Sequence, residues 1–229
     1  MLITGKQHRS FDPAGFHLPV HIVGCGGMGS HVATALARMG VGRENSPIYL
    51  YDHDTYEPHN LATQSVDTRS VGMPKVVDLK AKLRSINPDI LVFPTESKVD
   101  ATFRFTGFVF LCLDNMEERK EIVEFCIEGD RDVKCVIETR MDSETGISHC
   151  FKPSNQHHME CWWLYWYPSG HTERAPSCGD SHTSIMAIYG TTSLAINQFQ
   201  LHARKKTRHT LPNRVYQDFR YPRVDVEYW

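Results

Sequence analysis

The chain has 229 residues, enough for one large α/β domain with its own hydrophobic core. Its 25 Lys and Arg nearly balance its 27 Asp and Glu, which argues against a nucleic-acid or membrane-surface partner. We expect no secretory signal at residues 1–15, and every apolar run is too short to cross a bilayer. The seven cysteines, an odd number set within apolar segments, favour reduced thiols and a cytoplasmic protein.

The most distinctive segment is the glycine-rich VGCGGMGSH at residues 23–31. The apolar run VHIVG leads into it, and Val32, Leu36 and Met39 follow at helical spacing. A strand, a glycine loop and a helix in this order predict a nucleotide whose phosphates contact loop amides and the helix N-terminus. The glycines alone do not distinguish NAD from ATP, and a turn that merely needs glycine remains an alternative.

The remainder of the first 140 residues alternates between apolar runs and helical patterns. This alternation predicts a doubly wound, Rossmann-like, mainly parallel α/β sheet. The expected strands are PIYLYD, ILVF, FVFLCLDN and VKCVIE, and the expected helices cover 76–86 and 117–128.

The pattern changes from about residue 150. A Trp-rich segment without clear periodicity predicts a crossover loop over the sheet, followed by a long helix at 183–205. We therefore expect one nucleotide-binding domain over residues 1–205. Residues 206–229 are basic and aromatic, which favours a solvated tail or an edge strand.

Three charged residues occupy positions that suit a triphosphate. Asp52 ends the second strand, where an acid meets a ribose hydroxyl. Lys75, in GMPK, begins a helix and suits anionic phosphates, whereas hydride transfer has no evident use for it. Asp114 follows the most apolar strand, where a carboxylate near phosphates requires a bridging Mg²⁺. Taken singly, Lys75 is equally well a solvated lysine and Asp114 a helix cap.

Together these motifs resemble the ThiF/MoeB adenylyltransferases, the superfamily that includes ubiquitin-activating enzymes. The resemblance covers about residues 20–200, and its most specific parts are D-x-D-…-N-L-x-x-Q, G-x-P-K and L-D-N-x-x-x-R in this order. It implies an enzyme that uses MgATP to adenylate the C-terminal carboxylate of a ubiquitin-like or sulfur-carrier protein ending in Gly-Gly. It also implies a homodimer.

The resemblance further implies which residues bind the nucleotide and promote transfer. Lys75 would stabilise charge on the transferred phosphate, Asp114 would hold Mg²⁺, and Arg140 matches a family arginine whose role here is open. The implied ATP-binding residues are Gly24, Gly26, Gly27, Gly29, Asp52, Asp54, Asn60, Gln64, Lys75 and Asp114.

One departure concerns an arginine of the family. The usual N-L-x-R-Q run is NLATQ here, with Thr63 at the arginine position. Arg69 is a candidate replacement, and Arg9 is a candidate for the arginine that family dimers contribute across their interface. Loss of this arginine leaves a second hypothesis open, a catalytically weakened ATP-binding scaffold. An NAD-dependent oxidoreductase is disfavoured, because Lys75 and Asp114 would then have no role.

The cysteines give a second departure. Many relatives bind zinc through two Cys-x-x-Cys pairs, which this sequence lacks, and a mixed set of Cys150, His157, His158 and Cys161 is not favoured over ordinary surface residues. Cys178 lies where some relatives carry the cysteine that forms a thioester or persulfide. A small buried residue is an equally good interpretation of Cys178.

Overall fold

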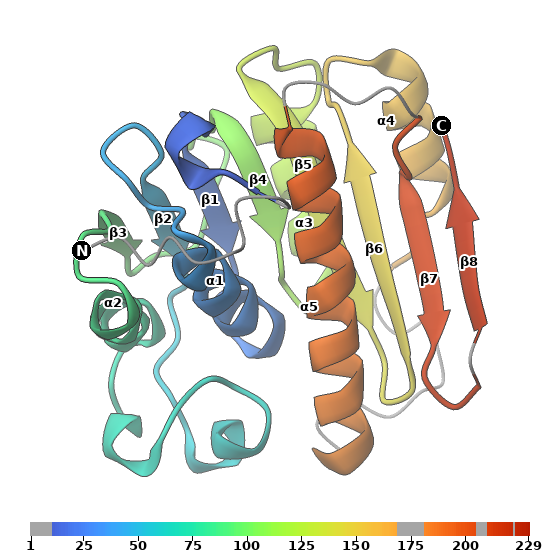
Figure 1. Cartoon of the computed structure of the whole chain (residues 1–229). Coiled ribbons are helices and arrows are strands. Elements are labelled where there is room, and N and C mark those ends of the chain that lie inside the picture. Colours follow the sequence, from blue (N-terminus) through green and yellow to red (C-terminus); the bar gives the residue numbers. More distant parts are fainter. Residues whose placement is uncertain (1–10, 169–180, 205–209, 222) are drawn as a thin grey trace.

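The protein is built around one twisted sheet, whose strands lie side by side across Figure 1. The computed structural model describes residues 11–168, 181–204, 210–221 and 223–229. The sheet has eight strands in the order β3-β2-β1-β4-β5-β6-β7-β8, parallel from β3 to β5 and antiparallel from β5 to β8. The strands are β1 (Val20–Val23), β2 (Ile48–Tyr51), β3 (Val92–Thr95), β4 (Gly107–Leu111), β5 (Val133–Met141), β6 (Thr145–Phe151), β7 (Arg214–Asp218) and β8 (Arg223–Glu227).

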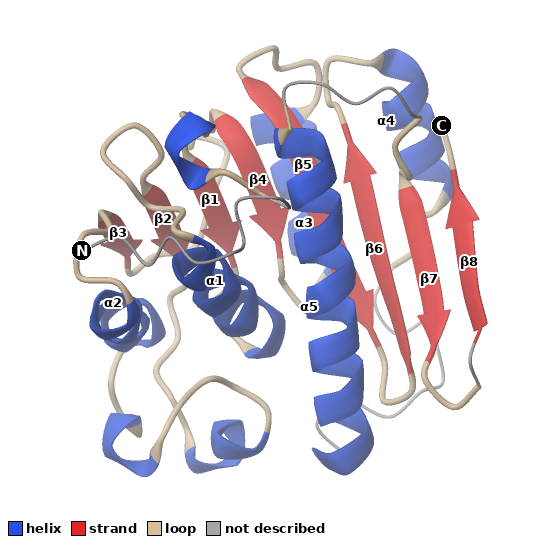
Figure 2. Ribbon diagram, in the orientation of Figure 1, coloured by secondary structure: helices blue, strands red, loops and turns tan. Residues whose placement is uncertain are grey.

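Helices cover both faces of this sheet (Figure 2). One hydrophobic cluster joins the first, second and last helices to one face, and another packs the third and fourth helices on the opposite face. This arrangement confirms the predicted doubly wound, mainly parallel α/β fold with a long helix near the C-terminus. The helices are α1 (Gly27–Met39), α2 (Lys75–Ile86), α3 (Met116–Ile122), α4 (Gln156–Leu164) and α5 (Ser181–Ala203).

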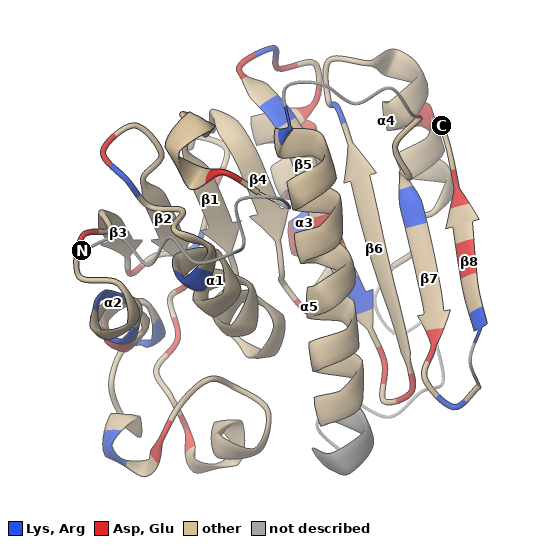
Figure 3. Cartoon of the chain, viewed as in Figure 1, with Lys and Arg blue, Asp and Glu red and all other residues tan. Residues whose placement is uncertain are grey.

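The packing of α5 explains its unusual composition. It carries no Lys, Arg, Asp or Glu along its length (Figure 3) and lies across β5 and β6. Phe199 on this helix is fully buried and packs its ring against Phe108 of β4 and against Phe16. Within the described residues, no helix is both long and apolar enough to cross a membrane.

Three elements were not predicted from the sequence, β6, α4 and β7. The sequence predicts an irregular crossover loop from about residue 150. This prediction is incomplete, because Gln156–Leu164 forms a helix there. The side chain of Asn155 caps it by accepting a hydrogen bond from the His157 amide at 3.0 Å. Trp162 then anchors the helix to the sheet as one of the largest fully buried side chains.

Candidate functional site

The backbone of the glycine loop is packed too closely to admit a side chain at two positions, Gly24 and Gly29. Gly24 has φ +85°, and a Cβ there would lie 2.9 Å from the carbonyl of Cys112. A Cβ on Gly29 would lie 1.8 Å from the Gly24 oxygen. Both positions therefore require glycine. Gly26 is the N-cap of α1 and has no side-chain cap, so the helix N-terminus lies beside bare backbone.

Asp52 ties this loop to the end of β2. Its Oδ2 accepts a hydrogen bond from the Cys25 amide at 2.7 Å, and its Oδ1 accepts one from the Asp54 amide at 2.9 Å. The contact follows from topology, because β1 and β2 are parallel neighbours and end at the same edge of the sheet. The structure thus brings together the loop and the acid that the sequence assigns to a ribose.

Lys75 lies at the start of α2 and is paired with Asp54. Its Nζ is 2.8 Å from Asp54 Oδ2, and its own amide donates to the Asp54 carbonyl at 3.0 Å. Lys75 is only 7% exposed. Partial burial alone would raise the pKa of Asp54, but the hydrogen bond and charge of Lys75 lower it below its ordinary value. The pair therefore holds a lysine amine against a carboxylate at the carboxyl edge of the sheet.

A polar hollow of about 310 Å³ opens beside this pair. This volume lies at the lower end of the range of small-molecule sites. Asp114 and the glycines are not among the residues that line it. The lining residues are His53, Asp54, Thr55, Glu57, His59, Asn60 and Lys75.

The NLATQ run leads from the hollow back to the glycine loop. Asn60 is buried in the short 3-10 helix Pro58–Ala62, and its Oδ1 accepts a hydrogen bond from the Glu57 amide at 2.9 Å. The Gln64 side chain reaches the loop, since its Nε2 is 3.7 Å from the Cβ position of Gly26. The Oε1 of Gln64 is buried without a hydrogen-bond partner. A buried acceptor of this kind is left for a donor that the protein itself does not supply.

Asp114 is exposed and follows β4, which ends at the same edge as β1. Another oxygen-rich group lies nearer the hollow, because ligand atoms of Asp52, His53 and Asp54 are within 4.8 Å of one another. Carboxylate oxygens are the ligands that Mg²⁺ prefers. The structure therefore offers carboxylates at this edge from both β2 and β4.

Arg69, the candidate replacement for the family's arginine, does not line the hollow. Arg69 is exposed and forms a two-pronged pair with Asp67, with Nε–Oδ1 at 3.2 Å and Nη2–Oδ2 at 3.0 Å. Thr63, at the family's arginine position, is buried, and its carbonyl oxygen is 3.3 Å from His31 Nε2. Arg9 and Cys178 lie outside the described residues.

The four residues considered for a mixed zinc site do not converge. Cys150 is buried in β6, while His158 Nδ1 accepts a hydrogen bond from the Lys152 amide at 3.1 Å. Only His157 and Cys161, one turn apart on α4, approach each other, at 3.8 Å. These four do not form a metal-binding group within the part of the chain that the structure describes.

Sequence reasoning missed a buried ionic cluster around Glu138 on β5. Its Oε1 accepts hydrogen bonds from Arg119 at 2.8 Å and Arg140 at 2.7 Å. Its Oε2 accepts from Trp162 at 3.1 Å and lies 2.9 Å from His149 Nδ1. Burial alone would raise the pKa of Glu138, but these cations and the His149 hydrogen bond lower it well below its ordinary value. Arg140, whose role the sequence left open, is thus a partner of Glu138.

Several known proteins are similar to this chain in sequence or in fold. Ubiquitin-like modifier-activating enzyme 5 of Rattus norvegicus is 32% identical over 126 residues, which are 48% of this chain and 30% of that protein. Molybdopterin-synthase adenylyltransferase of Salmonella typhimurium is 34% identical over 113 residues, 47% of this chain and 44% of that protein. The crystal structure of E. coli MccB with ATP shares the fold, with a TM-score of 0.65, 17% identity and coverage of 94% of this chain and 65% of that chain.

The chain spans less than half the length of these two curated relatives. The match to a protein family covers more of the chain: the model of the ThiF family aligns with residues 16–217. This range includes the glycine loop, the Asp52–Asp54 turn, Lys75 and Asp114. The chain therefore belongs to the ThiF family.

Proposed function

We propose that the chain is a MgATP-dependent adenylyltransferase that activates the C-terminal carboxylate of a ubiquitin-like or sulfur-carrier protein ending in Gly-Gly. A carboxylate oxygen attacks the α-phosphorus, the bond from that phosphorus to the bridging oxygen of pyrophosphate breaks, and an acyl-adenylate remains. The names of the relatives support this chemistry. The observation that carries it is the buried Lys75 ammonium at the wall of a polar hollow beside the glycine loop.

Each part of the candidate site, which comprises the glycine loop and the adjoining hollow, has a role in this proposal. The amides of the glycine loop and of the first turn of α1 would contact the phosphates, because their donors have no side-chain competitor. The Gln64 acceptor beside Gly26 would take a donor from the nucleotide. Asp54 keeps the Lys75 ammonium fixed before ATP arrives, so that stabilising the transferred phosphate needs little reorganisation.

The residues present fit a bound Mg²⁺. Asp114, with Asp52 and Asp54 at the same sheet edge, would supply hard oxygen ligands, and the ion would neutralise charge on the phosphates. Without such a cation, these carboxylates would repel the triphosphate. Asp114 is the proposed ligand because its strand ends beside the glycine loop, where a Cβ on Gly24 would lie 2.9 Å from the Cys112 carbonyl.

One observation favours a second candidate function, an ATP-binding scaffold with weakened turnover. Thr63 cannot supply the charge of the family's arginine, and Arg69 is held by Asp67 away from the hollow. Arginine on the transferred or leaving phosphates is worth orders of magnitude in related reactions. The scaffold would bind ATP without exchanging pyrophosphate.

ATP–pyrophosphate exchange distinguishes these functions. We expect exchange that depends on an added ubiquitin-like protein ending in Gly-Gly and that is lost in Asp114→Asn. The control is Asp132→Asn, an exposed acid at the opposite end of the sheet, before β5. Binding of ATP without exchange would establish the scaffold instead. Binding of NAD but not ATP would contradict both functions.

A homodimer and a cytoplasmic location complete the proposal. Met186 and Tyr189 are 48% and 57% exposed on the uncharged helix α5, and apolar surface of this kind suits a protein partner. The expected reduced thiols agree with the six described cysteines, all free and five of them buried. Light scattering on the purified chain tests the dimer.

A further inference from the structure

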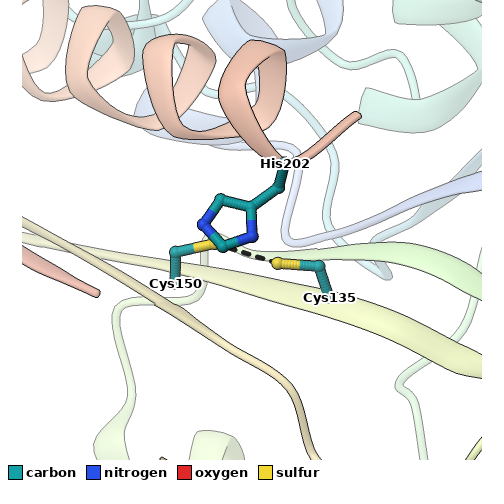
Figure 4. A group of neighbouring side chains, drawn as sticks. All are labelled: Cys135, Cys150 and His202. Carbon is teal, nitrogen blue, oxygen red and sulfur yellow. Dashed lines mark hydrogen bonds between the residues drawn. The ribbon is translucent and has the colours of Figure 1, made fainter. Parts of the chain in front are cut away.

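A group of two thiols and one imidazole lies between the sheet and the end of α5, in addition to the residues of the proposed ATP site. Cys135 of β5 and Cys150 of β6 are 1% and 0% exposed, and their Sγ atoms are 2.9 Å apart. The imidazole of His202, from the last turn of α5, lies over the two sulfur atoms (Figure 4). One ligand atom from each residue lies within 4.8 Å of the other two.

The strand register argues against a disulfide between these cysteines. Cys150 pairs directly with Ile137, and Cys135 lies two residues before Ile137 on the same face of the sheet. Such diagonal neighbours are separated by about 7 Å between β-carbons or somewhat less. A disulfide requires about 3.5–4.5 Å between them. A bridging ion suits the diagonal better, because tetrahedral Zn–S bonds of about 2.3 Å place two sulfurs roughly 3.8 Å apart. The two Sγ atoms, now 2.9 Å apart, would have to separate to admit the ion.

The three residues also supply the ligand types that zinc takes in proteins, cysteine sulfur and imidazole nitrogen. The Nε2 of His202 is buried without a hydrogen-bond partner, so this nitrogen is left for a ligand. Together the three residues offer two sulfur ligands and one nitrogen ligand.

We propose that Cys135, Cys150 and His202 bind a zinc ion that ties the end of α5 to strands β5 and β6. Binding forms two Zn–S bonds and one Zn–N bond and releases the two thiol protons to solvent, with no change of oxidation state. Two thiolates and a neutral imidazole balance the charge of Zn²⁺, whereas Cu⁺ would leave a buried net negative charge. His202 is half-buried and gives the ion its route from solvent, and a water molecule completes the tetrahedron.

Metal analysis of the purified full chain tests this site. We expect about one zinc per chain in the wild type, and at least a tenfold lower zinc content in Cys135→Ser and Cys150→Ser. The matched control is Cys126→Ser, because Cys126 is also buried but packs on the opposite face of the sheet, and it should retain zinc. His202→Gln changes a half-buried residue at a helix end, so it should fold normally and bind zinc more weakly.

A second measurement covers variants that fail to fold. Co²⁺ added to the metal-free wild type should produce the visible absorption of a thiolate-bound tetrahedral ion, and zinc should abolish it. The proposal is overturned if the wild type binds neither ion and both thiols react freely. It is also overturned if the chain is two hydrogens lighter until reduced, which indicates a disulfide, or if copper occupies the site instead. None of these outcomes affects the adenylation proposal, because exchange is not the readout.

Discussion

Two charged groups, one around Glu138 on β5 and one around Asp54 just after β2, differ in how many of their carboxylate oxygens are occupied by partners. Glu138 is fully buried, and each of its oxygens contacts two nitrogen atoms. Asp54 has a half-exposed side chain, with Lys75 on one oxygen and His53 at 3.3 Å from the other. The first group leaves its carboxylate no capacity for a ligand, whereas the second borders an open polar hollow.

Both groups pair a carboxylate with nitrogen cations, but the difference indicates a structural role for Glu138 and a ligand-binding role for the Lys75–Asp54 pair. A buried carboxylate surrounded by cations is costly to disturb, because each partner left behind is a charge out of water. In the Lys75–Asp54 pair only the carboxylate is half-exposed, and water can replace the ammonium there when Lys75 is removed, so its loss should cost little stability. Its value lies in the field that it presents to a ligand. The comparison therefore predicts that variants of Glu138 lose stability and variants of Lys75 lose activity.

The largest expected effect is that of Glu138→Ala. It leaves Arg119 and Arg140 buried without their shared carboxylate, so we expect a loss of about 3–5 kcal/mol in the free energy of unfolding. Urea denaturation measures it. Glu124→Ala, an exposed glutamate on the neighbouring helical segment, should change stability by less than about 0.5 kcal/mol. A loss below about 1 kcal/mol in Glu138→Ala would show that the cluster does not stabilise the fold.

Lys75→Ala should have the opposite effect, a loss of activity with little change in stability. We expect partner-dependent ATP–pyrophosphate exchange to fall by about 100- to 1000-fold, because an ammonium aimed at developing charge is removed. The urea midpoint should stay near that of the wild type, since Asp54 remains hydrated. Lys80→Ala, farther along the same helix, provides the control and should retain exchange. If Lys75→Ala unfolds the protein instead, the distinction between the two groups fails.

Acidification should affect the two groups at different pH. Burial lowers the pKa of His149 below the 6.5 of the unfolded chain. Its contribution to stability is therefore present above pH 6.5 and is lost as the pH falls toward the folded pKa. The pKa of Asp54 is lowered from 3.8, so the Lys75 pair loses its contribution only below about pH 4.

The measurement is a urea series between pH 7.5 and 5.5 on the wild type and on His149→Gln. The wild type should lose stability more steeply, by up to about 1.4 kcal/mol per pH unit for one titrating group. His21 has a pKa lowered by burial to about 4 and contributes with the same sign, but equally in both proteins. Identical slopes in the two proteins would show that His149 does not titrate in the cluster.

The parallel half of the fold was predictable because its signals are local. Each buried strand is followed within a few residues by a loop and a helix, and the apolar runs around Ile22, Leu50 and Phe110 are unbroken. The strand TGISHCF is harder to recognise, since Ser148 and His149 are polar yet buried. Their partners, Gln198 for Ser148 and Glu138 for His149, come from other elements.

The candidate site likewise has parts that local sequence signals predict and parts that depend on contacts between distant segments. Asp52 and the glycine loop follow from the order of strand, loop and helix, and the structure joins them directly. The Lys75–Asp54 pair spans 21 residues, and its contact depends on how the long polar segment between them folds back, which no local pattern specifies. The Glu138 cluster draws on β5, β6, α3 and α4, so its members share no spacing that a sequence could show.

The smallest expected change in stability is that of Arg69→Ala, which tests whether an exposed pair can also serve the reaction. Arg69 forms an exposed ion pair with Asp67. Such surface pairs contribute about 0–1 kcal/mol to the free energy of unfolding. We expect an unchanged urea midpoint but roughly tenfold slower exchange, because a guanidinium released from Asp67 would replace the arginine missing at Thr63. Arg84→Ala, exposed near the end of α2, is the control. Full exchange in Arg69→Ala would remove Arg69 from the site and leave Lys75 as the proposed cation on the phosphates.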